Sequence, residues 1–495
     1  MKHFTIKSRL YIIYYAIIAI QALACFVFFQ YDYPYHFFYK EQNQIFLMSW
    51  SYIATYFTKP AWAACLIGDF LTQFYYYLYA GAIILTLSLL TMGDIIRRAL
   101  QRAGLHAGIS FFIAIIAMIL EAVCHFKAEF RLASTMSVIG GAAMFFAVSY
   151  IIRMDRIRKL RFMNDAIIVT FTAITYWMFG YGWIVFVLFS MISGWIFISW
   201  KTGVGRIIYI PLFILCIPLT QKQYLLNAKE NYTYPGIGEL AKPEMELEDY
   251  LAVDNEYYFG HYNEVMYMCG KMDTIPEQMS FFYNLALAQK GQLANYVSLD
   301  RPTNLGTFYH VNSKTPILII KMTNELYYVL GDMTLTERAA MLANVFSPDN
   351  RNVRMIKRLA EANLISNDIP AATKYLRILD NTLVYKQWAA DHTPGMQTPD
   401  VKAEIAKKRQ YINKTDTLRL NDNCRMVLLE LLKSNPRNEI ALDYLLCSDL
   451  QAHEIGVFMD DYNKYYALQK RSMQPLLYRQ AVDFYNQNNP NKKQK

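Results

Sequence analysis

Long apolar runs fill the first 220 residues, and short polar segments separate them. A helix needs about 20 consecutive apolar residues to cross the hydrocarbon core of a bilayer. We therefore predict an all-α protein that begins with a transmembrane domain over residues 1–220. About seven segments approach the required length: Tyr11–Phe29, Phe74–Met92, Gly108–Phe126, Leu132–Ile152, Met163–Gly180, Gly182–Trp200 and Ile207–Leu219. The first run continues past the small residues Ala22–Cys25, so we expect a retained span rather than a cleaved signal.

The net charge of +9 lies entirely in the transmembrane domain. Residues 1–220 contain 17 Lys and Arg against 8 Asp and Glu, whereas the rest of the chain contains 32 of each. Thirteen of the 17 cations fall on the same side as the N-terminus, and four fall on the other: Lys40, Lys59, Lys127 and Arg131. The positive-inside rule then predicts a bacterial inner-membrane protein with a cytoplasmic N-terminus and a periplasmic C-terminal half. Because the loops explain the basic charge, we expect no nucleic acid as a partner.

A different pattern begins after the last apolar run. Residues 221–247 are polar and rich in proline and glycine, which is typical of a linker. Helical periodicity returns over residues 248–487 and predicts a soluble domain, and residues 488–495 are expected to be disordered.

The best-marked unit of that domain is Asn352–Ala389, in which two amphipathic stretches flank the breaker Ser366–Pro370. Small and apolar residues recur at three and four spacing in both stretches: Leu359, Ala360, Ala372, Leu376 and Leu379. The unit resembles a tetratricopeptide repeat, except that Asn363 stands where an aromatic residue is usual. Weaker units lie at Tyr257–Lys271, Phe281–Val297 and Glu439–Tyr466, so we predict an array of helical repeats.

Ionisable residues inside apolar spans are costly, and they are candidates for function by default. Asp69, Glu121 and His125 are such residues. Glu121 and His125 lie four positions apart and therefore on one helical face, where they are expected to form a polar pair. Such a pair either joins helices or serves as a proton or substrate site. The seven cysteines contain no CxxC pair, and we predict no metal site.

The segment Tyr31–Pro60, the first outer loop, is rich in aromatic residues and contains Asp32 and Glu41. It resembles the first outer loop of GT-C type glycosyltransferases, although Asp32 stands without the adjacent acid usual there. The resemblance implies a transferase that uses a polyprenyl-linked sugar at the outer face. Asp32 and Glu41 would then be catalytic, and Lys40 or Arg131 would bind phosphate. The alternative is an aromatic interfacial helix with solvated charges.

A second resemblance covers nearly the whole chain. The strings HFFYKEQNQIFLMSWSYI, FLTQFYYYLYAGAIIL, KRLAEANLI and KYLRIL are similar to an uncharacterised bacterial family of membrane proteins with a helical-repeat C-terminal half. That family implies no activity. Three hypotheses therefore stand beside one another: the transferase, a scaffold anchored in the membrane lipid whose repeats recruit envelope proteins, and a transporter. No residue pattern identifies a cofactor.

Overall fold

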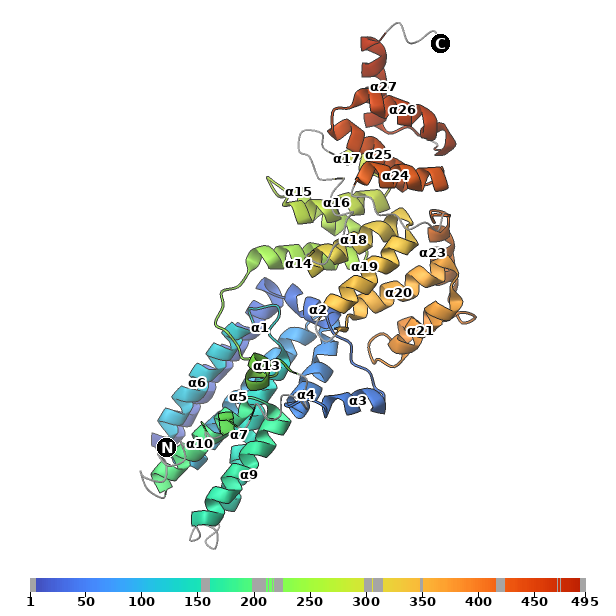
Figure 1. The fold of residues 1–495 in the computed structure, drawn as a ribbon. Coiled ribbons are helices and arrows are strands. Elements are labelled where there is room, and N and C mark those ends of the chain that lie inside the picture. The colour runs from blue at the N-terminus through green and yellow to red at the C-terminus, as the bar shows by residue number, and fades with distance from the viewer. Residues whose placement is uncertain are drawn as a thin grey trace. The chain divides into compact units, whose positions relative to one another are not determined.

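The computed structural model describes residues 6–152, 161–197, 211, 213–215, 217, 226–297, 305, 315–347, 350–414, 423–469, 471 and 473–489. These residues form helices and loops without a β-strand, which confirms the all-α prediction (Figure 1). The chain divides into two compact units. The first contains Met1–Glu41 and Phe46–Glu248, and the second contains Gln42–Ile45 and Asp249–Lys495.

The first unit is built from long apolar helices and several short ones. Its described elements are α1 (Ile6–Val27), the π-helix η1 (Phe28–Asp32), α2 (Tyr35–Gln42), α3 (Trp50–Tyr56), α4 (Trp62–Thr72), the 3-10 helix η2 (Gln73–Tyr76), α5 (Ala80–Ala103), α6 (Ala107–Cys124), α7 (Leu132–Ile152), α9 (Arg161–Phe179), α10 (Gly182–Phe197) and α13 (Ala228–Thr233).

Four helices in the described part of the chain are long and apolar enough to cross a membrane: Tyr11–Asp32, Ala80–Ala103, Ala107–Cys124 and Leu132–Ile152. Gly182–Ile196 is a shorter apolar helix. The expected span Phe74–Met92 starts later than predicted, because Gln73–Tyr76 forms a separate 3-10 turn and Tyr79 has a φ of 68°. The expected span Ile207–Leu219 lies largely outside the described residues.

Small residues allow the helices of the first unit to approach closely. A Cβ on Gly141 of α7 would lie 2.1 Å from the carbonyl oxygen of Gly182 at the start of α10, and one on Gly140 would lie 2.0 Å from the ring of Phe179. A Cβ on Gly68 of α4 would lie 2.5 Å from the backbone of Ala133. Contact through small residues is characteristic of helices that pack inside lipid.

Large apolar side chains remain exposed on the outside of these helices. Ile20 and Leu23 of α1 are 69% and 64% exposed. Aromatic residues that end or connect helices are exposed as well, with Trp50 at 77%. Contact with hydrocarbon makes such a surface favourable, and aromatic side chains prefer the membrane interface. The apolar helices therefore indicate association with a membrane.

The second unit is a succession of shorter amphipathic helices. They are α14 (Met245–Tyr258, which starts in the first unit), α15 (Tyr262–Gly270), α16 (Glu277–Gln289), α17 (Leu293–Tyr296), α18 (Ile317–Leu330), α19 (Met333–Phe346), α20 (Val353–Ser366), α21 (Ile369–Asp380), α22 (Lys386–His392), α23 (Pro399–Arg409), α24 (Cys424–Ser434), α25 (Glu439–Gln451), α26 (Ile455–Tyr465), the 3-10 helix η4 (Tyr466–Gln469) and α27 (Leu476–Asn488).

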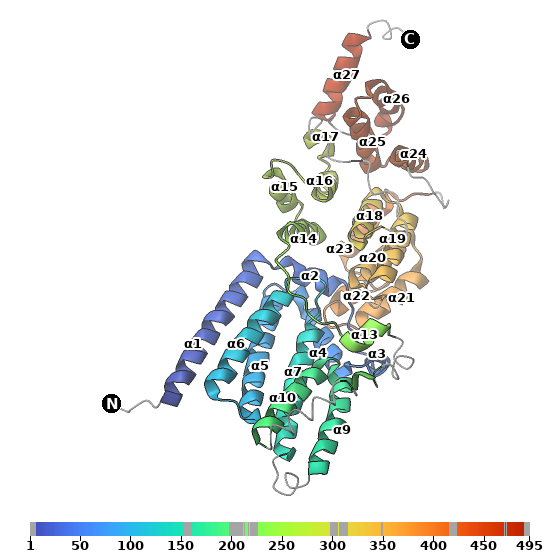
Figure 2. The same cartoon turned by 60° about the vertical axis from the view of Figure 1, so that its left-hand side comes forward.

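Consecutive helices from α18 to α21 pack against one another (Figure 2). The turn between α20 and α21 uses Asn367 at a φ of 67°, followed by Asp368, whose carboxylate accepts a hydrogen bond from the Ala371 N–H at 3.0 Å. The predicted small and apolar residues of these two helices are buried. Asn363 is also buried, and its Nδ2 donates to the Leu359 carbonyl at 2.8 Å.

Candidate functional site

A pocket of about 1290 Å³ opens in the second unit between residues of α14 and α27. Seven of its lining residues are large aromatics: Tyr257, Tyr258, Phe259, Tyr262, Tyr328, Trp388 and Tyr411. Tyrosine and tryptophan offer wide, rigid contact surfaces and a polar group at the edge. The lining is therefore suited to binding rather than to filling a core.

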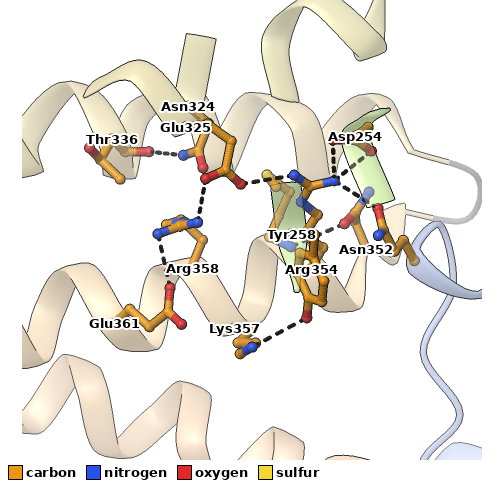
Figure 3. A network of polar contacts seen from close by, with 12 residues as sticks. Asp254, Tyr258, Asn324, Glu325, Thr336, Asn352, Arg354, Lys357, Arg358 and Glu361 are labelled. Carbon is orange, nitrogen blue, oxygen red and sulfur yellow. Dashed lines mark hydrogen bonds and ion pairs between the residues drawn. The ribbon is translucent and has the colours of Figure 1, made fainter. Parts of the chain in front are cut away.

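A network of buried ions forms one wall of the pocket (Figure 3). Arg354 on α20 donates through Nη1 to both carboxylate oxygens of Asp254, at 2.9 and 2.8 Å, and through Nη2 to Glu325 of α18 at 3.0 Å. Arg358, one turn later, donates to the other oxygen of Glu325 at 2.7 Å. Burial opposes ionisation of Glu325, but the charges of Arg358 and Arg354 prevail and lower the pKa of its carboxyl.

The same network includes the short piece of the first outer loop that belongs to the second unit. Gln42 Oε1 accepts a hydrogen bond from Arg354 Nη1 at 3.1 Å. Asn43 Oδ1 accepts from Lys321 Nζ at 2.8 Å and from Asn352 Nδ2 at 3.1 Å, and all three of these side chains are buried. The loop thus contributes structural partners to a wall of the pocket.

Cations lie against the aromatic rings of the pocket. Lys357 Nζ is 4.9 Å from the ring centroids of both Tyr258 and Trp388. Tyr328 contacts two cations, with Arg358 Cζ at 3.6 Å and Lys408 Nζ at 4.6 Å from its centroid. Such contacts contribute about 0.5–2 kcal/mol each and hold the charged groups in place.

Ion pairs also form where residues of α25 line the pocket. Arg471 Nη1 donates to Asp443 of α25 at 2.9 Å, and its Nε lies 3.9 Å from Glu439. The hydroxyl of Tyr478 donates to the same oxygen of Asp443 at 2.8 Å. Burial raises the pKa of Asp443 even though Arg471 stands beside it.

The pocket concentrates positive charge. Residues 249–495 contain 29 Lys and Arg and 27 Asp and Glu. Eight of these cations but only five of the acids line the pocket, which leaves 21 cations and 22 acids for the remainder of this region. The positive excess of the region is therefore located in the lining, where it attracts anionic ligands.

The loop residues predicted to be catalytic lie in different surroundings. Asp32 ends η1 and is exposed, whereas Glu41 near the end of α2 is 2% exposed. Between them, Glu248 caps the start of α2 by accepting from the backbone N–H groups of Tyr35 and His36. Lys40 Nζ is buried without a hydrogen-bond partner among the described residues, and burial lowers its pKa to about 7.

Arg131, the second predicted phosphate-binding residue, forms an ion pair with Asp69. Its Nη2 lies 3.0 Å from Asp69 Oδ1, and the hydroxyl of Tyr56 donates to Oδ2 of the same carboxylate at 3.0 Å. The structure thus brings together two residues that the sequence suggested for separate roles. The pair links the start of α7 to α4.

The predicted polar pair of α6 is bridged by a residue of α7. Thr135 Oγ1 donates to Glu121 Oε1 at 2.7 Å, and its oxygen also lies 2.8 Å from His125 Nε2. The bridge joins two apolar helices, which is a known use of polar residues inside membranes. Asp32 and Glu41, which the enzyme hypothesis predicts to be catalytic, do not line the pocket of the second unit.

The sequence did not reveal the pocket, although some signals were present. Arg358 and Glu361 have the spacing of neighbours on one helical face, and Lys407 and Lys408 follow an apolar position of α23. They converge with residues of α14, α18 and α27, helices that lie far from them in the sequence. Helical periodicity alone does not predict such contacts.

These observations define a helical protein in which membrane-length apolar helices precede a helical unit with a charged, aromatic pocket. Residues 8–495 match the model of a family of unknown function, DUF6057, and the chain belongs to this family. The match covers nearly the whole chain, as expected from the resemblance to an uncharacterised family. Comparison with curated proteins and with solved structures gives no match.

Proposed function

We propose that the protein is a membrane-anchored binding protein whose second unit takes up an acidic polypeptide segment in its pocket. The observation that carries this proposal is the excess of cations among aromatic residues in the lining. Carboxylates of a ligand satisfy the cations, and its apolar or aromatic side chains pack against the tyrosine and tryptophan rings.

The size of the pocket favours a chain segment over a metabolite. Pockets for small molecules usually measure about 300–1,000 Å³. The pocket here, at about 1290 Å³, exceeds that range and is lined by helices from both ends of the unit. A polypeptide segment of several residues fills a pocket of this volume, whereas a small molecule leaves most of the lining in contact with water.

The first unit supplies the anchor in this proposal. In this proposal the first unit has about seven spans, the N-terminus is cytoplasmic and the second unit is periplasmic, as the positive-inside rule predicts from the distribution of basic residues. The helices of the second unit act as an array of tetratricopeptide type, and the ligand is a segment of another envelope protein. The transferase hypothesis requires a lipid-accessible cavity at Asp32 and Glu41, and the engagement of Arg131 with Asp69 does not favour it.

The proposal is tested with purified full-length protein in a neutral detergent. The probe is a short fluorescent peptide that contains Glu, Leu and Trp, and its counterpart has Lys in place of each Glu. We expect the acidic peptide to bind at least about tenfold more tightly than the basic one, a difference of about 1.4 kcal/mol. Equal affinities for the two peptides contradict the proposal.

Two variants of α23 locate the binding. Lys407 and Lys402 are both exposed on this helix, but only Lys407 lines the pocket. Lys407→Glu should weaken binding of the acidic peptide several-fold and reduce its salt dependence, because charges at a rim act through electrostatic attraction. Lys402→Glu is the matched control and should bind as wild type does. The same loss in both variants indicates non-specific attraction and contradicts the proposal.

A further inference from the structure

Resting on the proposed function, we propose that Arg358 and Lys408 form an oxyanion subsite that holds a carboxylate of the bound peptide, and that Lys408 makes the pocket specific for acidic ligands. The proposal names one residue that decides specificity within the larger pocket. It stands on the geometry of two cations around one tyrosine ring and on the partners that each cation has.

Tyr328 fixes the positions of both cations. Its side chain is only 9% exposed and belongs to an apolar cluster with Ala362 and Ile365, against which Ile405 of α23 packs. Arg358 lies against this ring from α20, and Lys408 lies against it from α23 one turn after Glu404. Packing therefore holds both cations against one ring before a ligand binds.

The carboxylates near Lys408 are largely committed to other cations. Glu325 accepts hydrogen bonds from both Arg354 and Arg358. Glu361 lies 3.1 Å from Arg358 Nη1. Glu404 is exposed and shares the helix of Lys408, yet no ion pair joins these two residues in the described part of the chain.

Both cations retain donors for a ligand. Among the described residues, the Nζ of Lys408 has no hydrogen-bond or ion-pair partner, and its contact is with the Tyr328 ring. Arg358 is 8% exposed, and its Nε, unlike the two terminal nitrogens that face Glu361 and Glu325, has no hydrogen-bond partner among the described residues. An arginine and a lysine with such donors match the oxygens of a carboxylate or phosphate group.

The acidic groups around Lys408 do not fully compensate the positive charge of its ammonium group. Burial, followed by the charge of Arg358, lowers the pKa of Lys408 to about 8, although Glu404, Glu325 and Glu361 act in the opposite direction. His392 of α22 faces the same group of glutamates, and burial lowers its pKa, so it is neutral at the pH of interest. An anion at the subsite favours the charged lysine and raises its pKa.

Because protonation of Lys408 and binding of the oxyanion favour each other, the affinity changes with pH in a definite direction. Binding of the oxyanion needs the protonated lysine, so affinity is highest below the pKa of about 8 in the empty pocket and falls as the pH rises through it. Arginine in place of Lys408 remains charged over this range, and methionine is never charged. The two substitutions therefore predict different pH profiles.

The experiment measures the affinity of the fluorescent acidic peptide for full-length protein between about pH 6.5 and 9.5. Wild type should lose affinity above pH 8. Lys408→Arg should bind at least as tightly and keep its affinity to the highest pH, whereas Lys408→Met should bind about tenfold more weakly with a flat profile, since a hydrogen bond to a charged group is lost. Lys402→Met on the same helix should behave as wild type.

Competition with inorganic phosphate separates the sources of the oxyanion. Displacement of the peptide by millimolar phosphate from wild type, but not from Lys408→Met, indicates a general oxyanion subsite. Resistance to phosphate indicates a subsite specific for peptide carboxylates, and both results agree with the proposal.

If the peptide binds and Lys408→Met keeps wild-type affinity and pH profile, the proposed subsite is wrong while the proposed function stands. If wild type binds no acidic peptide at any pH, the proposed function and this inference fail together.

Discussion

Arg354 Nη1 donates a hydrogen bond to Gln42 Oε1 at 3.1 Å, although the two residues are 312 positions apart in the sequence. The same guanidinium binds Asp254 and Glu325, so a single arginine joins the loop segment Gln42–Ile45, α14 and α18 inside the second unit. A fully buried arginine with two carboxylate partners is costly to remove, because its loss leaves uncompensated charges in the interior.

The first prediction concerns this arginine. Arg354→Met should destabilise the second unit by about 3–5 kcal/mol, since Asp254 and Glu325 are left buried without their shared partner. Thermal unfolding followed by circular dichroism measures the change. Arg377→Met on the exposed face of α21 is the control and should stay within about 0.5 kcal/mol of wild type. An equally small effect of Arg354→Met contradicts a structural role for the network.

The second prediction concerns the stability of the ligand-free protein at alkaline pH. The pKa of Lys408 is about 8 in the folded protein and about 10.4 in an unfolded chain, so the unfolded chain binds more protons between these values. The contribution of Lys408 to stability therefore rises with pH in this window. The melting temperature of wild type relative to Lys408→Met should increase between about pH 8 and 10, and a constant difference would show that Lys408 is an ordinary solvated lysine.

The third prediction tests the close helix contact of the first unit. Gly141→Leu should prevent α7 from approaching α10, because even a Cβ would lie 2.1 Å from the Gly182 carbonyl oxygen. The variant should aggregate on detergent extraction, as seen by size-exclusion chromatography. Gly108→Ala near the start of α6 is the control, since its Cβ meets only an ordinary contact at 3.5 Å. A monodisperse Gly141→Leu protein contradicts this contact.

The fourth prediction concerns the outer loop. If the protein binds a partner and does not catalyse transfer, Asp32→Asn should express, insert and complement a deletion as wild type does, because exposed substitutions change stability by only a few tenths of a kcal/mol. Removal of a general base costs on the order of 100-fold or more in rate. If Asp32→Asn is present at normal levels but fails to restore the envelope-glycan defect of a deletion, the result favours the transferase hypothesis.

Much of the local structure could be predicted from the sequence. The helix Leu132–Ile152 starts at the predicted residue, because the apolar run begins directly after Arg131. In α20 and α21, Asn367 and Asp368 mark the turn, and the three and four spacing of small and apolar residues identifies the buried faces.

The pocket and the loop contact could not be predicted in the same way. Gln42 and Asn43 look like ordinary polar loop residues, and their partners lie 278 to 312 positions further along the chain. Asn363 looked like a defect in the repeat, yet it is satisfied by a backbone carbonyl of its own helix. Lys408 stands in a run of three basic residues, and only the fold shows that one of them faces a tyrosine ring.

The most direct test of the binding account is to map where an acidic peptide contacts the protein. A photoreactive form of the peptide is cross-linked to full-length wild type in detergent, and mass spectrometry locates the attached residues. The account predicts cross-links on pocket-lining residues of α20, α22 and α23, which disappear when unlabelled acidic peptide is added in excess. Cross-links concentrated in the first unit, or scattered over the surface and unaffected by competition, would contradict it.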